Sequence, residues 1–405
     1  MRILVQKFGG SSVASLDRMK EVMGKVKSGL DEGYKVIVVL SAMAGETNRL
    51  LALAGEWSET PDLAEMDALV TTGEQVSISL FSILLNDHGI KARSLLASQI
   101  PLHTDATHGN ARILKIDGNK LRELLAFYDV LVVAGFQGIT HEGRITTLGR
   151  GGSDTSAVAL AAALGSVECD IYTDVDGVFT TDPNTCSAAR KLDKICYEEM
   201  LELSSMGAKV LQIRSVEFAQ KYSVPLRVRS TFSNNPGTLV TQEDDSMESV
   251  LVSGIAFDKN QARVTIRQAA DRPGVAATLF GALSEADVVV DMIIQNMSIE
   301  GRTDMTFTVP QKDLKRTIDV VRKILPSLGA EDVVSDSHVA KVSVVGVGMR
   351  SHSGVAARIF EALKNENINI LMISTSEIKV TCLIDDKYTE LAVRVLHDVF
   401  DLGKE

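Results

Sequence analysis

A short polar segment, Gly149–Thr155, has the composition of an anion-binding turn. It reads Gly-Arg-Gly-Gly-Ser-Asp-Thr and stands between a hydrophobic strand and an alanine-rich run over 157–164. Glycines let a backbone approach a ligand closely, and Ser, Asp and Thr are residue types that cap helix starts. The first turn of a helix offers free N–H groups, and Arg150 adds a planar fork for a carboxylate or phosphate. The segment therefore predicts an anion site or, equally simply, a capped helix.

A lysine precedes two glycines at the first turn of the chain. The apolar residues 3–5 predict a buried strand, which Lys7, Gly9 and Gly10 follow before an amphipathic helix. A Walker A loop has its lysine after the last glycine, so this turn is of another kind. Lys7 could reach phosphates that the loop amides also contact. A surface lysine beside a turn explains the pattern as well.

Polar residues follow several other strand candidates. Ser41 and Thr47 come after the apolar run 36–40, and Glu74 stands near the start of a helical pattern over 68–85. Glu74 could receive an ammonium group or merely compensate the helix dipole. The aspartates in 174–184 suggest calcium, but the glycine is fourth in that loop and not sixth, which excludes an EF-hand. No metal site made of protein ligands is predicted.

The elements that must position these residues alternate in type. Short apolar strands and helical patterns succeed each other through residues 1–230, which predicts an α/β fold with a mostly parallel sheet and helices on both faces. Glycine turns follow at least four of the strands, on the side where such sheets bind ligands. Turn-forming and acidic residues over 233–246 predict that the first domain, 1–245, ends there.

The remainder of the chain contains an internal repeat. Residues 271–283 match 351–363 at an offset of 80 positions, with a shared glycine, a Val-Ala-Ala run, a phenylalanine and an Ala-Leu pair. Each copy lies between strand patterns, which predicts two α+β domains, 250–335 and 336–405. A further strand candidate at 250–257 could complete either repeat, so consecutive and interleaved arrangements both remain open.

Composition excludes several classes of protein. The chain of 405 residues is 45% apolar and 5% aromatic, and its net charge of −11 argues against nucleic acid or an anionic membrane as partner. The four cysteines show no paired or metal-binding spacing, which favours a reduced, cytoplasmic protein. The start of the chain does not resemble a signal peptide, and no apolar run is long enough to span a membrane.

Together the motifs make the chain resemble an aspartokinase over essentially its whole length. The carrying motifs are Lys-Phe-Gly-Gly-Ser-Ser at 7–12, Gly-Arg-Gly-Gly-Ser-Asp at 149–154, Thr-Asp-Val-Asp-Gly-Val at 173–178 and the paired repeats, which resemble ACT domains. The resemblance implies an amino-acid-kinase fold and the reaction of ATP with the side-chain carboxylate of aspartate. The products are 4-phosphoaspartate and ADP, and the reaction is the first step toward lysine, threonine and methionine.

The resemblance also implies roles for individual residues. A carboxylate nucleophile, with an ordinary pKa of about 3.9, needs no general base, but its approach to ATP needs positive charge. Catalysis is assigned to Lys7, Asp154 and Lys209, with Mg²⁺ as the expected metal cofactor. Aspartate is expected to contact Ser41, Thr47, Glu74 (at its ammonium), Arg150 (at its α-carboxylate), Gly151, Gly152 and Ser153. ATP is expected to contact Lys7, Phe8, Gly9, Gly10, Thr173, Asp174, Phe179, Asn184, Lys209 and Val210. Many relatives have tyrosine at the position of Phe179 and arginine at that of Asn184.

The repeats are expected to bind an amino-acid effector, lysine, threonine or both. Free N–H groups at the turns with Asp271 and Gly274, and at 352–354, could take its carboxylate. Polar residues at the opposite strand ends are further candidates, and Asp291 or Glu377 could meet its ammonium. They are Asp291, Gln295, Asn296, Ser374, Thr375, Ser376 and Glu377. Alternatively, these residues cap elements at a dimer interface. The resemblance implies a homodimer through the ACT domains, and an α2β2 assembly with a subunit started near Met247 stays open.

Two other functions remain as alternatives. One is a different amino-acid kinase, acting on glutamate or N-acetylglutamate, and the other is an inactive protein that senses amino acids. The presence of Lys7, Arg150 and Asp154 favours activity, while Thr47 and Glu74 favour a substrate with a free α-amino group.

Overall fold

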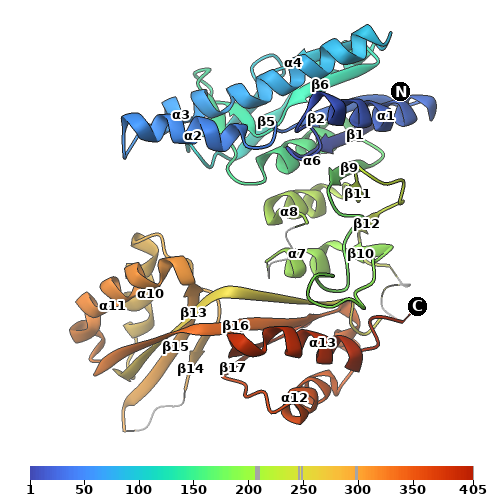
Figure 1. The fold of residues 1–405 in the computed structure, drawn as a ribbon. Coiled ribbons are helices and arrows are strands. Elements are labelled where there is room, and N and C mark those ends of the chain that lie inside the picture. Colours follow the sequence, from blue (N-terminus) through green and yellow to red (C-terminus); the bar gives the residue numbers. More distant parts are fainter. Residues whose placement is uncertain (206–209, 245–246, 248–249, 297–299, 405) are drawn as a thin grey trace. The chain divides into compact units, whose positions relative to one another are not determined.

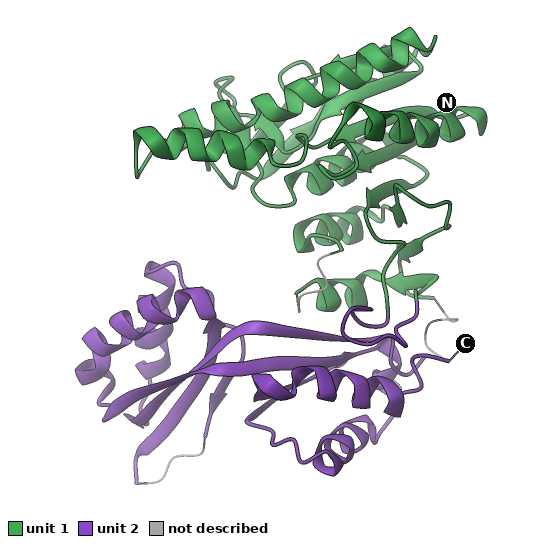
Figure 2. Ribbon diagram, viewed as in Figure 1, with its two compact units in different colours: residues 1–179, 191–205, 209–247 green, residues 180–190, 206–208, 248–405 purple. Residues whose placement is uncertain are grey.

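The structure, a computed structural model, describes residues 1–205, 210–244, 247, 250–296 and 300–404 (Figure 1). These residues form two compact units, coloured separately in Figure 2. The first unit holds 1–179, 191–205, 210–244 and 247, and the second holds 180–190 and 250–404. The segment 180–190 therefore belongs to the second unit, although it lies far inside the predicted domain 1–245.

An eight-stranded sheet forms the centre of the first unit. Its strand order is β10-β12-β11-β9-β1-β2-β6-β3, and every neighbouring pair is parallel except β11 and β12. The predicted α/β class with a mostly parallel sheet is confirmed. The strands are β1 (Ile3–Phe8), β2 (Lys35–Leu40), β3 (Ala92–Leu95), β6 (Val130–Ala134), β9 (Cys169–Thr173), β10 (Lys194–Cys196), β11 (Leu226–Ser230) and β12 (Thr238–Thr241).

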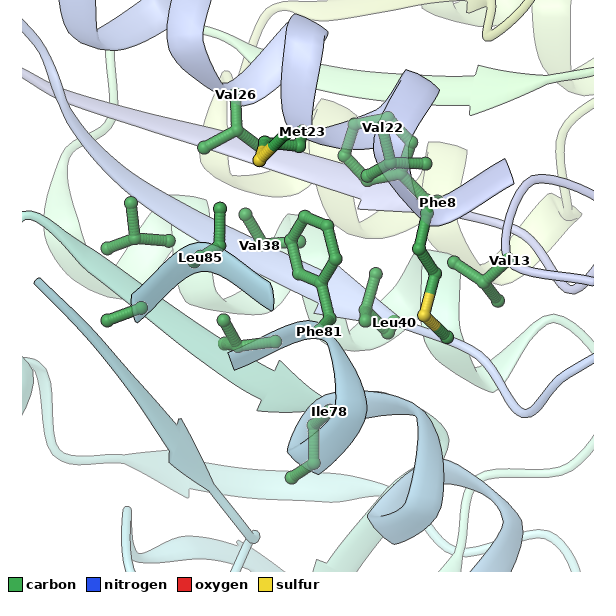
Figure 3. Packing of buried hydrophobic residues seen from close by; sticks show 14 of the residues in the cluster. Phe8, Val13, Val22, Met23, Val26, Val38, Leu40, Ile78, Phe81 and Leu85 are labelled. Atoms are coloured by element: carbon green, nitrogen blue, oxygen red, sulfur yellow. The ribbon is translucent and has the colours of Figure 1, made fainter. Parts of the chain in front are cut away.

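Helices cover both faces of this sheet. On one face α1 (Leu16–Asp31) and α4 (Thr72–Asp87) bury their apolar sides against β2, as Figure 3 shows for Val22 and Phe81 packing around Val38. On the other face α6 (Gly152–Leu164) packs against β1, β2 and β9. Since β2 and β6 are apolar along their whole length, both of their faces are buried, as the parallel arrangement requires.

A smaller sheet and further helices belong to the described part of the first unit. The small sheet has the order β5-β4-β7-β8, with β4 (Leu102–Thr104), β5 (Ile113–Ile116), β7 (Gln137–Ile139) and β8 (Ile145–Thr147). The remaining helices are α2 (Glu46–Trp57), α3 (Leu63–Val70), α5 (Gly118–Leu125), α7 (Tyr197–Ser205) and α8 (Ile213–Tyr222).

The second unit is built on one six-stranded antiparallel sheet with the order β14-β15-β13-β16-β18-β17. Its first repeat contains β13 (Gly254–Ala270), α10 (Val275–Glu285), β14 (Ile293–Gln295), β15 (Arg302–Pro310), η1 (Gln311–Asp313) and α11 (Leu314–Leu328). Its second repeat contains β16 (Asp332–Val345), η2 (Val347–Ser351), α12 (Val355–Asn365), β17 (Met372–Thr375), β18 (Lys379–Asp385), η3 (Asp386–Tyr388) and α13 (Thr389–Val399).

The two repeats share their central strands. The first half of β13 pairs with 341–345 of β16, and its second half, from Arg263 on, pairs with 332–336. Ile255 lies in the same core cluster as α12 and α13, whereas Val264 lies in the cluster of α10 and α11. The first half of β13 thus contributes to the core of the second repeat, although β13 belongs to the first repeat along the chain, which is the interleaved arrangement.

The segment 180–190 enters the core of this second unit. The carbonyl of Thr180 accepts a hydrogen bond from Ile255 N at 2.7 Å, and its hydroxyl lies 2.9 Å from Nε2 of the fully buried His397. Cys186 is buried in the core cluster of the second repeat. The chain therefore leaves the first unit after Phe179, packs as part of the second, and returns at Lys191.

One helical stretch of the described residues, Leu63–Asp87, is long and apolar enough to cross a membrane, with a mean hydropathy of 1.4. Half of its most apolar window is buried within the protein, and α4 packs on β3 and β6. A core helix of this kind meets the same criteria as a membrane span.

Candidate active site

A cavity of about 700 Å³ opens at one edge of the large sheet. It brings together ten residues that the sequence predicted for catalysis or ligand binding. They are Lys7, Gly10, Ser41, Thr47, Glu74, Arg150, Gly151, Gly152, Ser153 and Asp154. These residues come from segments far apart in the chain, so the fold gathers them.

Parallel strands explain why these segments meet. β1, β2 and β6 are neighbours that end at the same edge, where Ser41 N donates to Phe8 O and Gly135 N donates to Leu40 O. The carboxyl ends of parallel strands are where open α/β sheets bind ligands. The loops that follow these three strands all contribute to the cavity.

Lys7 and Asp154 form an ion pair inside the cavity. Lys7 Nζ lies 2.6 Å from Asp154 Oδ1, and both side chains are about nine-tenths buried. Asp154 stands in the first turn of α6, whose N-terminus carries the positive end of the helix dipole. The pair fixes the Lys7 ammonium beside the N-terminus of α6, an arrangement suited to a phosphate group.

Gly151 permits the tight turn that leads into α6. Its φ is 70°, and a Cβ atom there would lie 1.8 Å from Cγ of Gln212. No other residue type fits this position without moving the start of α8. Gln212 also lines the cavity, although the sequence did not predict it.

Glu74 is a buried carboxylate in the same cavity. It is 3% exposed, and its Oε1 accepts a hydrogen bond from Ala42 N at 3.1 Å. Oε2 has no hydrogen-bond partner among the described residues. Burial raises the pKa of Glu74 to about 7, because the charged form is poorly solvated there. A cationic group in the cavity would supply the missing partner.

The pKa of Glu74 predicts a pH dependence. If ionised Glu74 receives a substrate ammonium, kcat/KM for that substrate should fall by about tenfold per pH unit below pH 7, because protonation removes the charge. The turnover number should fall less, since the bound ammonium favours the ionised form. Initial rates between pH 5.5 and 8.5 measure both quantities. A profile of the Glu74→Gln variant with the same slope would contradict this role.

The remaining predicted substrate residues lie around the rim. Ser41 Oγ donates to Ser153 Oγ at 3.0 Å, which ties the end of β2 to the start of α6. Thr47 lies in the first turn of α2, whose N-cap Gly45 has a φ of 84°. Arg150 is exposed between two glycines of positive φ, so its guanidinium is accessible from solvent.

The sequence did not predict Asp67, which lines the cavity and is 2% exposed. Its Oδ1 accepts from Thr147 Oγ1 at 2.5 Å, and its Oδ2 lies 2.8 Å from His108 Nδ1. Gly109 N donates to the same carboxylate. Asp67 thereby joins α3 to the end of β8, two residues before Gly149. No sequence signal marks it, because its partners come from two other segments.

The predicted nucleotide residues are more dispersed. Thr173 ends β9 beside the end of β1, and Thr231 N donates to its carbonyl at 2.9 Å. Asp174 and Phe179 follow in the first unit, whereas Asn184 belongs to the second, where its backbone and side chain both donate to Asp182. None of these four residues lines the cavity.

The other four predicted nucleotide residues are Phe8, Gly9, Lys209 and Val210. The Phe8 side chain is fully buried and stacks on Tyr172 at 4.5 Å, so only its backbone is free to face a ligand. Gly9 lies between Phe8 and the cavity residue Gly10, and Val210 is half-buried in the turn before α8. Lys209 lies outside the described residues.

The predicted effector residues divide between two places. In the first repeat Asp271 N donates to Gly301 O, and Asn296 N donates to Asp304 O beside Gln295, so these residues share one end of the sheet with Gly274. In the second repeat Gly346 N donates to Ile378 O, which places Ser374, Thr375, Ser376 and Glu377 beside the corresponding turn.

Asp291 departs from the predicted arrangement. Its N–H donates to Thr308 O, and Thr308 pairs with Arg263, seven positions along β13 from Ala270. At about 3.3 Å per strand residue it lies roughly 20 Å from the turn of its own repeat. Its carboxylate pairs with the buried Lys341. The sequence expectation placed Asp291 and Gln295 at one strand end, whereas Asp291 lies four residues before Gln295.

Comparison with known proteins identifies relatives over the whole chain. A model of the amino acid kinase family matches residues 2–230, and a model of the ACT domain matches 267–325 and 342–400. Aspartate kinase of Stutzerimonas stutzeri is 54% identical, with 99% of this chain and 98% of the relative covered. Aspartokinase of Helicobacter pylori is 50% identical, with coverages of 99% and 100%.

Solved structures agree with these relatives. Aspartokinase III of E. coli in complex with aspartate and ADP has a TM-score of 0.79 and 29% identity, covering 98% of this chain and 99% of its own. The same enzyme in complex with lysine and aspartate has a TM-score of 0.75 over the same shares of the two chains.

Proposed function

Because this chain belongs to the aspartate kinase family, we propose that the cavity around Lys7, Glu74 and Asp154 is its site of phosphoryl transfer to aspartate. The activity is the ATP-dependent phosphorylation of the side-chain carboxylate of L-aspartate to 4-phosphoaspartate. The reaction opens the biosynthesis of lysine, threonine and methionine, under feedback control through ACT domains. The relatives do not favour an inactive sensor or another amino-acid kinase as the alternative.

One observation supports this placement more than any other. A single cavity holds a buried carboxylate with an unpartnered oxygen, Glu74, and an ion-paired lysine at a helix N-terminus, Lys7. The first suits an ammonium group and the second suits a phosphate. Aspartate needs both neighbours, since its ammonium must be held while its carboxylate meets the polyphosphate.

Charge compensation is the main catalytic task. The substrate carboxylate and the γ-phosphate repel each other, and their approach is favoured by preorganised positive charge. Lys7 and the first-turn amides of α6 supply it, with Lys209 as a further cation from the predicted set. Asp154 holds Lys7 in place and abstracts no proton, because the nucleophile is already ionised.

The substrate is held at its two other charges. Glu74 receives the α-ammonium, and Arg150 binds the α-carboxylate with its planar fork. Ser41, Thr47, Gly151, Gly152 and Ser153 complete the contact surface. Fixing both charges leaves the side-chain carboxylate to point toward Lys7, which lowers the entropy cost of the reaction.

ATP is the phosphoryl donor, and we place its phosphates at Gly9, Gly10 and Lys7. The nucleoside would lie along Thr173, Asp174 and Phe179, with Phe8, Asn184 and Val210 near it. Mg²⁺ is commonly held by one or two carboxylates together with substrate phosphates and water. The small number of carboxylates in the cavity is compatible with such a site. Asp154 is the carboxylate of the cavity nearest to Lys7. Bound there, Mg²⁺ would neutralise charge on the phosphates.

A panel of acceptors tests the proposed function. Release of ADP should be fast with L-aspartate and at least about a hundredfold slower with L-glutamate, N-acetyl-L-glutamate and N-acetyl-L-aspartate. N-acetyl-L-aspartate is the matched control, because it keeps the reacting carboxylate and removes only the ammonium. Equal rates with aspartate and its acetylated form would contradict the role of Glu74.

The second unit is proposed to bind the effector and to pair two chains. The relevant residues lie at the turn ends of both repeats: Asp271, Gly274, Gln295 and Asn296 in the first, Ser374 to Glu377 in the second. The edge strands β14 and β17 leave backbone groups free for pairing with another chain. The proposed assembly is a homodimer, with an α2β2 assembly that includes a subunit started near Met247 as the alternative, and the proposed location is the cytoplasm.

Effector binding makes a direct prediction. Lysine or threonine, alone or together, should bind at millimolar concentration or tighter and inhibit the kinase reaction, because regulation requires unequal affinity for two states. Gln295→Ala should weaken binding, whereas Asp291→Ala should matter less, since Asp291 is paired with Lys341. Calorimetry measures the affinity of each variant for lysine and threonine. Unchanged binding to Gln295→Ala would remove the first turn from the effector site.

A further inference from the structure

A second cavity, of about 1000 Å³, lies in the first unit on the sheet face that α1 covers. Its lining shares no residue with the candidate active site. The position follows from the strand register. Leu4, Gln6 and Phe8 point to one face of β1, and Phe8 packs against α1. In the next strand Asp170 lies beside Gln6, and Tyr172 lies beside Phe8.

Polar residues line up across this half of the sheet. Asp170 is the neighbour of Arg227 in β11, and Tyr172 is the neighbour of Arg229. Helices α1 and α4 pack on β1, β2, β3 and β6, whereas the cavity lies over β9 and β11. A sheet face that carries Gln, Asp and Arg in adjacent positions is unusual in a buried sheet, because such groups need partners there.

Three buried side-chain atoms of the lining have no hydrogen-bond partner among the described residues. Two are acceptors, Gln6 Oε1 and Asp170 Oδ1, and one is a donor, Arg229 Nε. Gln6 and Asp170 are each 2% exposed. Arg229 Nε is 3.8 Å from Asp170 Oδ1, which is too far for a hydrogen bond.

Several other charged groups in or beside the lining have hydrogen-bond partners. Arg227 forms two hydrogen bonds with Glu168, and Lys25 donates to Ser233 O and Asn234 Oδ1. The buried atoms of the lining that lack a hydrogen bond therefore lie on Gln6, Asp170 and Arg229, and the last two also form a long ion pair with each other. These atoms require N–H donors for the two acceptors and an oxygen acceptor for Arg229.

We propose that this cavity binds a zwitterionic amino acid, with its ammonium on Asp170 and Gln6 and its carboxylate on Arg229. The ammonium and carboxylate of an α-amino acid are joined through one carbon, so they can reach groups as close as Asp170 and Arg229. Both contacts are charge-assisted hydrogen bonds, which are stronger than neutral ones. The volume leaves room for a side chain. This site is separate from the aspartate site and from the ACT-like repeats, and it does not depend on the proposed function.

The surroundings of Asp170 predict that binding depends on pH. Burial raises the pKa of Asp170 to about 7. The charged or titratable groups around it are Glu168, just before β9, Tyr172 of β9, Arg227 and Arg229 of β11, Glu21 and Lys25 of α1, Glu32 at the C-cap of α1, and Tyr34. From β1 the cavity is lined by Leu4 and Gln6. Since the ammonium prefers ionised Asp170, affinity should rise between pH 6 and pH 8.

A local fluorescence reporter tests the proposal. The one tryptophan of the chain, Trp57, is 93% exposed and lines neither cavity, so Trp57→Phe removes it safely. Phe232→Trp then places a reporter at the second cavity, where Phe232 is partly exposed. The full chain is titrated with glycine as the zwitterion, methylammonium as the cation alone and acetate as the anion alone.

Glycine should give a saturable change of emission and bind at least about tenfold more tightly than either one-ended probe. Asp170→Asn in the reporter background should weaken glycine binding by at least about tenfold. Glu21→Gln is the matched control, since Glu21 lines the same cavity but pairs with Arg18. Kinase activity of each variant reports correct folding. If Asp170→Asn does not fold, Gln6→Leu and the rise of affinity with pH take its place.

Three results would overturn the proposal. In the first, an active reporter protein shows no saturable response to glycine. In the second, glycine and methylammonium bind with equal affinity. In the third, Asp170→Asn leaves the affinity for glycine unchanged. The first would leave the cavity as a water-filled groove, and the second would make it a cation site. The third would place the amino acid elsewhere.

Discussion

Replacing Lys7 by alanine is expected to lower the turnover number at least about a hundredfold, which is the usual loss when a preorganised transition-state donor is removed. The reason is geometric. Lys7 is held at 2.6 Å by Asp154 at the N-terminus of α6, so its charge is in place before the reaction begins. A free lysine would have to be ordered first, and water would screen it.

Lys35→Ala is the matched control for this experiment. Lys35 begins β2 at the opposite end of the same sheet and also pairs with an aspartate, Asp129, at 2.7 Å. Loss of that pair should leave the turnover number within about twofold, as expected for a partly exposed ion pair. Steady-state rates with both substrates saturating give the turnover numbers of the two variants for comparison. Near-normal turnover of Lys7→Ala would remove Lys7 from the mechanism.

Replacing Arg150 by lysine should raise KM for aspartate by roughly tenfold and change KM for ATP much less. A lysine keeps the charge but cannot form the two parallel hydrogen bonds of the guanidinium. The rise in KM for aspartate therefore measures what these two hydrogen bonds contribute to binding. Arg150 is exposed between two glycines, and its replacement should not disturb the core.

Arg144→Lys provides the comparison for Arg150. Arg144 lies just before β8 and pairs with Glu65 at 2.8 Å outside the cavity. Its replacement should leave both Michaelis constants unchanged. Equal losses for aspartate and ATP in Arg150→Lys would mean that Arg150 serves the phosphates.

Residues at the ends of parallel strands were predictable from sequence. Lys7, Ser41 and Asp154 each stand at a glycine turn between a strand and a helix, and the rule that such ends share one edge is enough to bring them together. The fold class follows from the same pattern, since the buried strands read as unbroken apolar runs.

Residues that depend on tertiary contacts were not predictable. Asp67 is held in the cavity by contacts with Thr147 and His108, which are distant in sequence. Gln212 lies in the cavity because its side chain packs directly against Gly151. The position of Asp291 also depends on tertiary contacts. Its type suggested a ligand contact, but the register of β13 and the buried Lys341 give it a structural partner instead.

The segment 180–190 limits how this protein can be divided. It is encoded in the middle of the catalytic half, yet it fills part of the core of the second repeat through Cys186 and Thr180. A polypeptide begun near Met247 would therefore lack a piece of its own interior, and His397 would lose its hydroxyl neighbour. Conversely, a catalytic half cut off before residue 250 would lack the residues that bury Thr180 and Cys186. Gene fission at the apparent domain border would leave two incomplete products, each needing the missing part from another chain.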